Sequence, residues 1–260
     1  MKKYPTLSVV VLTKNAQDLI SECLDSAKFA DDLLIIDSGS TDKTIEIVKS
    51  KKARIINFPG QKIEFAKWRN QGLKEARGDW LLYLDSDERI TPSLQKEIIS
   101  TIAHPTTVAY EIPRQNYYLG QPVRFGGAWP DYVKRLFRKD KLRGWENELH
   151  ENPIVVGSFG RLKSPLLHFT HRDLSSMMEK TKEWSKIEAR LLYEANHPPV
   201  TWWRILRPMV SEFWQRGIIK QGLRDGAVGW IEVIFQVFSR FITYARLWEL
   251  QWQAKNKKQS

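Results

Sequence analysis

The sequence predicts an α/β domain with a Rossmann-like, mostly parallel sheet and helices on both faces, followed by C-terminal amphipathic helices. Three observations lead to this prediction. Short apolar runs alternate with longer amphipathic runs in the first third of the chain, polar residues collect where the apolar runs end, and helical periodicity dominates from residue 174 onward. With 260 residues, 42% of them hydrophobic, the chain can bury a sizeable core.

Strand-like and helix-like runs alternate regularly at the start of the chain. Four short runs are expected to be buried strands: residues 7–13, 32–38, 53–58 and 79–85. Three stretches between them carry apolar side chains at helical spacing: residues 16–28, 41–51 and 62–76. Strand, helix and strand repeated in this order predict a parallel sheet with right-handed crossovers.

The remainder of the chain divides into two further regions. Residues 92–103 are expected to form a helix, because Pro92 suits a first helical turn. Runs at 108–114 and 132–137 are strand-like, and we expect antiparallel strands and active-site loops around them. The predicted organisation is a catalytic domain over 1–173, with halves 1–104 and 105–173, and a helical region over 174–260.

The single cysteine and the lengths of the apolar runs bear on the compartment. Cys23 alone cannot form an internal disulfide, which favours a reducing environment. The apolar run near the N-terminus is too short for a secretory signal, and no uninterrupted apolar run approaches the roughly 18 residues of a spanning helix. We therefore expect a cytoplasmic protein.

Polar side chains follow three of the predicted strands. These are Thr13 to Asn15 after the first strand, Asp37 to Asp42 after the second, and Asp85, Asp87 and Glu88 after the fourth. Because ligands bind at the carboxyl ends of parallel strands, these residues are expected to line one site.

The D-x-D pair, Asp85 and Asp87, brings two negative charges together beside a single basic neighbour, Arg89. Mg²⁺ or Mn²⁺ held together with a diphosphate would offset this charge, since such ions are bound by one or two carboxylates plus phosphate oxygens. The alternatives are a solvated turn that caps the next helix, or an aspartyl nucleophile of the phosphatase kind. The usual position of that nucleophile, on the first strand, is occupied here by "VVVLTKN".

Three segments in order carry a family resemblance: "SVVVLTKN", "LLIIDSGSTDKT" and "AKWRNQGLKEARGDWLLYLDSDE". Over residues 6 to about 172, the chain resembles the inverting glycosyltransferases of family 2, which have the GT-A fold. The resemblance implies a hexosyltransferase that uses a UDP-sugar donor with Mg²⁺ or Mn²⁺.

The same resemblance implies roles for individual residues. Thr13, Asn15 and Asp37 are expected at the nucleoside, and Arg69 at the base or the diphosphate. Asp85 is expected to reach the ribose or the metal, and Asp87 to bind the metal directly. Each role suits its chemistry, because a neutral base needs a fixed acceptor and a departing diphosphate needs positive charge.

An inverting transfer also needs a base that takes the proton from the attacking hydroxyl. The segment "ENELHENP" offers two glutamates, Glu148 and Glu151. Its "LHE" resembles the V-H-E signature of the bacterial lipopolysaccharide-core branch of the family, which implies Glu151, with Glu148 in reserve. Asp131, in "WPDYVKRLFR", resembles another family motif and is a third candidate.

Three more residues are candidates for binding phosphate or metal. Arg135 could steady a phosphate, although strand-edge cations are often only solvated. His168 and His171, in "LLHFTHRD", are spaced like ligands, and some GT-A enzymes complete the metal shell with a late histidine. Of the two, His168 is the expected ligand.

The end of the chain is basic and rich in tryptophan. Residues 199–260 hold ten Lys or Arg against four Asp or Glu, and six of the eleven tryptophans. Two amphipathic stretches there are typical of helices that lie on a membrane surface, although they could instead cover the sheet or form a dimer.

Within this region, the segment from Pro208 to Trp230 carries a second resemblance. It is similar to the ending of small glucosyltransferases that add a β-linked sugar to the inner-core heptose of lipopolysaccharide. This similarity implies UDP-glucose as the donor, a lipid A–core acceptor, and a peripheral place on the cytoplasmic face of the inner membrane.

Several alternatives stay open at this point. The acceptor could be a peptide or another glycolipid, or the protein could be a catalytically silent scaffold at a membrane. Nucleic acid is not the expected partner, despite a pI near 9.6, because the C-terminal cations lie on helices with large apolar faces. The oligomeric state cannot be deduced.

Overall fold

The computed structural model describes residues 4–59, 64–147 and 151–257. The chain forms two compact units. The first comprises Met1–Arg114 and Asp131–His168, and the second comprises Gln115–Pro130 and Phe169–Ser260. This division differs from the expected boundary at residue 173, because segment 115–130, assigned above to the catalytic domain, packs with the C-terminal helices.

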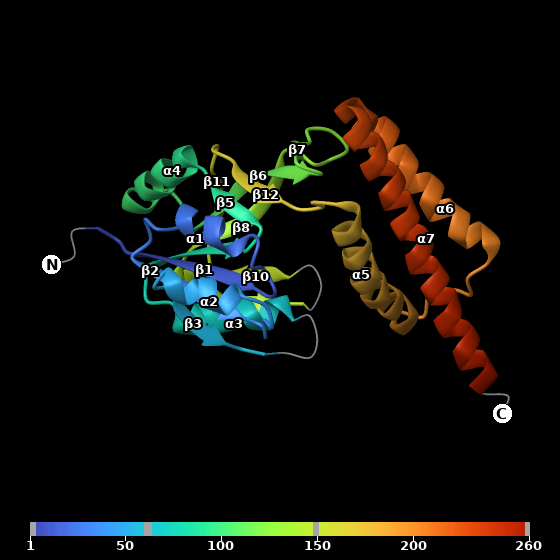
Figure 1. Cartoon of the computed structure of the whole chain (residues 1–260), viewed down its shortest axis with the longest axis horizontal. Helices are drawn as coiled ribbons and strands as arrows, with labels where there is room; N and C mark the ends of the chain where they lie inside the picture. Colours follow the sequence, from blue (N-terminus) through green and yellow to red (C-terminus); the bar gives the residue numbers. More distant parts are fainter. Residues whose placement is uncertain (1–3, 60–63, 148–150, 258–260) are drawn as a thin grey trace. The chain divides into compact units, whose positions relative to one another are not determined.

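The first unit is built on the predicted parallel sheet (Figure 1). Its parallel strands follow the order β3-β2-β1-β4, and their bounds are β1 Leu7–Thr13, β2 Asp32–Asp37, β3 Arg54–Asn57 and β4 Trp80–Asp85. In this register Thr13 is paired with Asp37, and Leu12 with Asp85. The carboxyl ends of three strands are therefore level, as the sequence predicted.

Antiparallel pairing extends the sheet beyond β4, which confirms the expected mixed sheet. The order continues β8-β6-β12-β5, where β8 is Asp131–Arg138, β6 Ala109–Tyr118, β12 Leu166–Phe169 and β5 Glu88–Ile90. Two short strands, β7 (Gln121–Pro122) and β11 (Phe159–Arg161), also pair with β6. A separate pair is formed by β9 (Leu142–Glu146) and β10 (Asn152–Val155).

Helices cover both faces of the parallel strands, because alternate side chains of a strand point to opposite faces. Val9 and Val11 of β1 face a core formed with α1 (Ile20–Ser26), α2 (Thr44–Ser50) and α4 (Pro92–Ala103). Val10 and Leu12 face the opposite side, where α3 (Phe65–Glu75) packs. Gly72 lets α3 approach closely, since a Cβ there would lie 2.5 Å from Val10 Cγ1.

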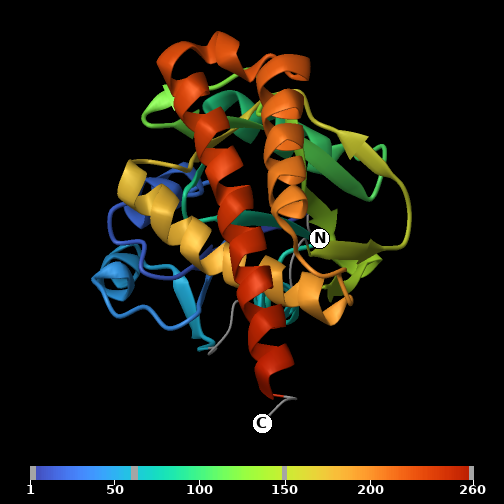
Figure 2. The ribbon, with the colours of Figure 1, turned by 90° about the vertical axis from the view of Figure 1, so that its right-hand side faces the viewer.

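The second unit is dominated by helices, as the sequence predicted. They are α5 (Leu174–Glu194), α6 (Trp202–Phe213), a π-helical turn (Trp214–Ile219), a 3₁₀ turn (Gly222–Asp225) and α7 (Gly226–Lys257). An Asp173–Ser176 capping box starts α5. Both α5 and α6 pack against α7 (Figure 2).

The loop that follows β7 is tied to the start of α7. The Asp225 carboxylate accepts from the backbone N–H groups of Arg124 and Phe125, and Gly126 donates to the Lys220 carbonyl at 2.8 Å. Gly229 lets α7 pack closely against the 3₁₀ turn, because a Cβ there would lie 2.1 Å from the Gly222 carbonyl oxygen. The "DG…GW" pattern of the tail thus has a packing role.

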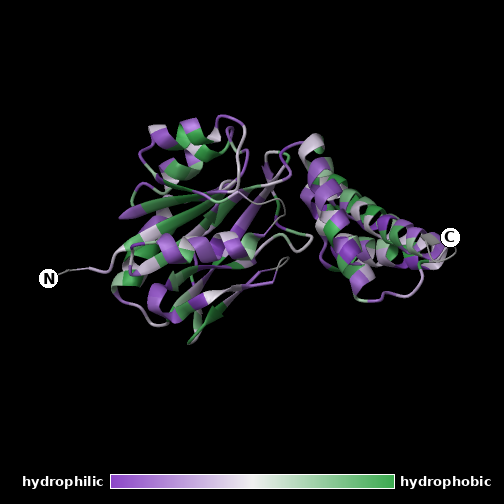
Figure 3. Ribbon diagram, turned by 90° about the horizontal axis from the view of Figure 1, so that it is seen from below, coloured by the Kyte–Doolittle hydropathy of each residue, from purple (hydrophilic) through white to green (hydrophobic). Residues whose placement is uncertain are grey.

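Within the described residues, one helical segment, Gly222–Asn256, is long and apolar enough to cross a membrane by length and composition. The sequence-based expectation that no such segment exists is therefore wrong. It required an uninterrupted apolar run, whereas α7 carries scattered polar residues among its apolar ones (Figure 3). About a third of the apolar window, 33%, is buried.

Candidate active site

The level carboxyl ends of β1, β2 and β4 bring the sequence-predicted residues to one edge of the sheet. Thr13 is buried at the end of β1, and its Oγ1 is a buried atom that has no hydrogen-bond partner in the described structure. Asp37 is buried at the end of β2, and Asp85 ends β4. An unsatisfied buried hydroxyl at a strand end suits a ligand that supplies the missing partner.

The two loops after β1 and β2 are bonded to each other. Asn15 Oδ1 accepts from the Thr41 N–H at 2.8 Å, a bond that ties the first loop to the second. The Asp37 carboxylate accepts from the N–H groups of Gly39 and Ser40 and from the Ser40 hydroxyl. Since a carboxylate has about four acceptor sites, Asp37 retains capacity for one further donor.

The carboxylates after β4 are offset by arginines, a solution that the sequence did not predict. Asp85 accepts from Arg135 through Oδ2, and from Arg69 Nη2 through Oδ1 at 3.2 Å. Glu88 is fully buried, with 0% exposure, and its Oε1 accepts from Arg135 at 2.7 Å and from Arg114 at 3.3 Å. Arg135 Nη2 thus holds two carboxylates, while its Nε is a buried atom without a partner in the described structure.

Asp131 extends this network through Arg114. Arg114 donates to Asp131 Oδ2 from Nε at 2.9 Å and from Nη2 at 2.6 Å, and the two residues face each other in the β6–β8 pairing. Sequence reasoning placed Glu88 at this edge without a specific role, and it assigned no place to Arg114. Glu88 directly follows the D-x-D pair, but only the strand pairing shows which arginines reach it.

Arg69 connects Asp85 to the predicted base Glu151. Its Nε donates to Glu151 Oε1 at 3.0 Å, while Nη2 reaches Asp85. The Arg69 side chain is 3% exposed, and its guanidinium lies over the Trp145 and Tyr83 rings, 4.9 and 5.5 Å from their centroids. Nη1 is a buried atom without a partner in the described structure, so one donor of this guanidinium remains unsatisfied.

The charges in this network reinforce one another. Burial alone would raise the pKa of Asp85, but Arg135 and Arg69 outweigh it and hold that pKa well below its usual value. Burial opposes the charged form of Arg135 and Arg114, yet the neighbouring carboxylates raise the pKa of both guanidinium groups. Asp85, Arg135 and Arg114 are therefore charged at neutral pH.

Asp87 lies at the tip of the turn between β4 and β5, beside His168. The antiparallel pairing of β5 with β12 sets His168 opposite Glu88, and His168 Nε2 lies 3.2 Å from Asp87 Oδ2. Adjacent ligands of an octahedral cation at 2.0–2.1 Å lie about 3 Å apart. The carboxylate and the imidazole therefore fit a shared divalent cation.

The predicted three-residue metal set does not assemble. Among the described residues, no group of three or more His, Cys, Asp or Glu side chains gathers to hold a metal ion. Asp85 is held by Arg69 and Arg135, which leaves Asp87 and His168 as the pair. His171 belongs to the second unit, where its Nδ1 lies 2.9 Å from Glu232 Oε2. Glu148, the reserve base, lies outside the described residues.

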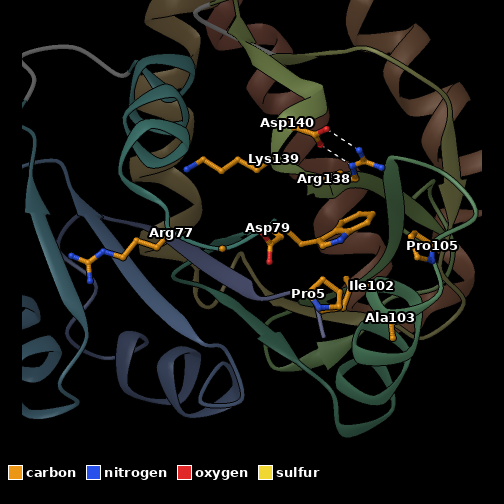
Figure 4. A pocket seen from close by; sticks show the side chains of 11 residues that line it. Pro5, Arg77, Asp79, Ile102, Ala103, Pro105, Arg138, Lys139 and Asp140 are labelled. Atoms are coloured by element: carbon orange, nitrogen blue, oxygen red, sulfur yellow. Dashed lines mark hydrogen bonds and ion pairs between the residues drawn. The ribbon is translucent and has the colours of Figure 1, made fainter. Parts of the chain in front are cut away.

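A separate hollow of about 820 Å³ lies at the opposite edge of the sheet, next to the amino ends of β1 and β4 (Figure 4). Four of its polar side chains are already engaged. Arg138 pairs with Asp140, Lys139 donates to the Ala76 carbonyl, and Asp79 accepts from the Thr6 N–H. These satisfied groups offer a ligand little, in contrast to the unsatisfied atoms of the carboxyl edge.

Comparison with known proteins shows the family of this chain. The family model described as Glycosyl transferase family 2 matches residues 8–167. The lipopolysaccharide core biosynthesis glycosyltransferase LpsC of Rhizobium meliloti is 25% identical over 257 residues, 94% of this chain and 92% of that protein. An uncharacterised glycosyltransferase of Rickettsia typhi is 26% identical over 275 residues, 98% of this chain and 90% of that protein.

A solved structure has a similar fold. It is residues 1–349 of S. aureus TarS in complex with UDP-GlcNAc, which matches with a TM-score of 0.50 at 16% sequence identity, covering 96% of this chain and 92% of that one. The fold is the GT-A fold implied by the sequence resemblance. The chain belongs to glycosyl transferase family 2 and is a glycosyltransferase.

Proposed function

We propose that this glycosyltransferase transfers glucose from UDP-glucose, with inversion, to a lipid-anchored inner-core sugar of lipopolysaccharide. The relationship to LpsC, named for lipopolysaccharide core biosynthesis, supports the acceptor class. The TarS complex with UDP-GlcNAc supports a uridine nucleotide donor. The observation that carries the proposal is the position of Arg69, which holds the donor-side Asp85 and the acceptor-side Glu151 on one guanidinium.

Glu151 is the proposed general base. In an inverting transfer the acceptor hydroxyl gives its proton to the base, its oxygen bonds to the anomeric carbon, and the bond to the diphosphate breaks. Within the described structure, the hydrogen bonds that Glu151 accepts from Arg69 all reach Oε1. Oε2 is therefore the oxygen assigned to take the proton. Asp131, bonded twice by Arg114, is the alternative base.

Asp87 and His168 are the residues that would hold a divalent cation, with remaining positions filled by diphosphate oxygens and water. Such a cation would supply positive charge to the departing diphosphate. Arg69 adds fixed positive charge nearby, and its unsatisfied Nη1 can donate to a diphosphate oxygen. Thr13 and Asp37 retain hydrogen-bonding capacity suited to the nucleoside.

A lipid-anchored acceptor sets the place of action. We propose a peripheral location on the cytoplasmic face of the inner membrane, where a nucleotide sugar and a growing core oligosaccharide would meet. The rival acceptors are a peptide or another glycolipid, and the rival from a different class is a catalytically silent scaffold.

A donor and acceptor screen with the full chain tests the proposal. Release of UDP is measured with UDP-glucose, UDP-galactose and UDP-GlcNAc, in the presence of Mn²⁺ and a core-lipid, peptide or unrelated glycolipid acceptor. We expect UDP-glucose with the core lipid to give the fastest release, and the product to be β-linked by NMR. An α-linked product would overturn inversion, and no turnover with any pair would favour the scaffold.

The base is tested separately by Glu151→Gln and Asp131→Asn. We expect Glu151→Gln to bind UDP with unchanged affinity and to lose turnover by at least about 100-fold. Asp131→Asn is expected to lose less. The reverse order would transfer the role of base to Asp131.

A further inference from the structure

The second unit exposes large apolar side chains along α6 and α7. Trp202 is 72% exposed and Val210 65% exposed. α6 has no buried residue. Exposed apolar side chains on this scale mark a binding surface on a folded protein.

These side chains form one stripe on each helix. On α6 and the π-helical turn, the stripe is formed at helical spacing by Trp202, Trp203, Leu206, Val210 and Trp214. On α7 it is formed by Trp230, Ile234, Phe238, Phe241, Trp248 and Trp252. We call these two sets the tryptophan stripes. Six of these eleven residues are tryptophan, a side chain enriched where lipid meets water.

Cations flank the stripes. Arg207 lies four residues after Trp203 and three before Val210, so it borders the α6 stripe, and Lys255 lies three residues after Trp252 on α7. Both side chains are exposed. An apolar stripe bordered by Lys and Arg is complementary to an anionic lipid surface, where the cations meet headgroups and the tryptophans enter the headgroup–acyl boundary.

The packing of α7 argues that this helix lies on the surface and does not cross the bilayer. Its opposite face packs against α5, a helix rich in charged residues. Arg240 of α7 donates to Glu212 at 3.1 Å and to Glu188 of α5 at 3.5 Å, and Glu232 is buried beside His171. Crossing would place these charges and α5 in hydrocarbon, which is strongly unfavourable.

The length of α7 agrees with this orientation. Its 32 residues span about 48 Å, well beyond the roughly 30 Å of the hydrocarbon core. The apolar side chains continue along one side of the helix from Trp230 to Trp252, as expected for a helix lying flat in the interface.

We propose that the tryptophan stripes bind an anionic phospholipid surface, with α6 and α7 lying in the plane of the membrane. This extends the proposed function by naming the surface that reaches the membrane. Vesicle binding needs neither donor nor acceptor, so its outcome is independent of whether the proposed sugar transfer is correct.

The chain offers a matched pair of variants for the test. Ile234, in the α7 stripe, is 52% exposed, and Ile99, on α4 of the first unit, is 47% exposed. Flotation of the full chain is measured with phosphatidylcholine vesicles that contain or lack phosphatidylglycerol. We expect binding that needs phosphatidylglycerol, a loss of at least about tenfold for Ile234→Asp, and no change for Ile99→Asp.

A variant with altered charge gives a second measurement and leaves the tryptophan stripes unchanged. Arg207→Glu combined with Lys255→Glu should weaken flotation and reduce its dependence on salt. Light scattering of the free protein tests whether the tryptophan stripes instead bind a second copy of the chain. Equal flotation of Ile234→Asp and the unchanged protein would overturn the proposal, as would a stable dimer that Ile234→Asp converts to a monomer without any change in flotation.

Discussion

His168 Nε2 lies 3.2 Å from Asp87 Oδ2, a contact created by the antiparallel pairing of β5 and β12. The turn after β4 supplies the carboxylate, and a strand from the other end of the first unit supplies the imidazole. Neither residue is adjacent to the other in sequence. Their proximity is the reason to treat His168 as part of the catalytic edge.

Replacing either partner should weaken dependence on metal in a measurable way. We expect Asp87→Asn to lower sugar transfer by at least about 100-fold with an unchanged fold, because the ligand loses its negative charge. His168→Gln should raise the Mn²⁺ concentration for half-maximal turnover by about tenfold. The readouts are UDP release across a Mn²⁺ titration and the circular dichroism spectrum. Asp25→Asn, at an exposed ion pair on α1, is the control, and full activity of Asp87→Asn would remove the metal role.

Arg69 should affect turnover more than donor affinity, because it holds Glu151 and Asp85 together. Arg69→Gln is expected to lower kcat by about 100-fold, since small displacements of reacting groups have effects of this size. Arg69→Lys should recover part of the loss, because lysine keeps the positive charge but lacks the planar guanidinium that donates to two carboxylates at once. Steady-state kinetics of UDP release measure kcat and the KM for the donor. Arg138→Lys, in an exposed pair with Asp140, is the control, and a change confined to KM would contradict the positioning role.

Glu88 should contribute strongly to stability. Glu88→Gln leaves Arg135 and Arg114 short of a buried negative charge, and breaking a buried ion pair costs about 3–5 kcal/mol. We expect the free energy of unfolding, measured with urea, to fall by about 3 kcal/mol. Glu111→Gln removes the partner of Arg161, an exposed side chain on the same sheet, and should change it by less than about 1 kcal/mol. Equal effects would show that the buried network is not a stabilising one.

Asp32 should make stability depend on pH. Burial alone would raise the pKa of its carboxyl, but hydrogen bonds from Arg54, Ser8 and the Arg77 N–H outweigh it and lower that pKa. The contribution is therefore complete above the unfolded pKa of about 3.9 and is lost as the pH falls through the lower folded value.

Asp32→Asn should accordingly lower the free energy of unfolding by about 1–2 kcal/mol near neutral pH. The difference from the unchanged protein should shrink below about pH 4. Urea unfolding across the pH range measures it, with the exposed Asp18→Asn as the control. A difference that grows on acidification would contradict the assigned direction of the pKa shift.

The carboxyl edge illustrates how far sequence reasoning reached. Strand ends are readable from apolar periodicity, which places Thr13, Asp37 and Asp85 at one edge, and the register of β1, β2 and β4 agrees. Periodicity does not show which groups compensate the negative charge of these carboxylates. A metal was expected to offset Asp85, whereas Arg69 from α3 and Arg135 from β8 do so.

The sequence by itself determined the alternation of strands and helices, the edge where polar residues collect, and the amphipathic character of the C-terminal helices. These features depend on local periodicity, which is written in neighbouring residues. Only the tertiary structure decided that Glu88 and Arg114 join the network, that His168 meets Asp87, and that segment 115–130 packs with the helices. Such contacts depend on which strands pair and in what register, and no local pattern encodes that choice.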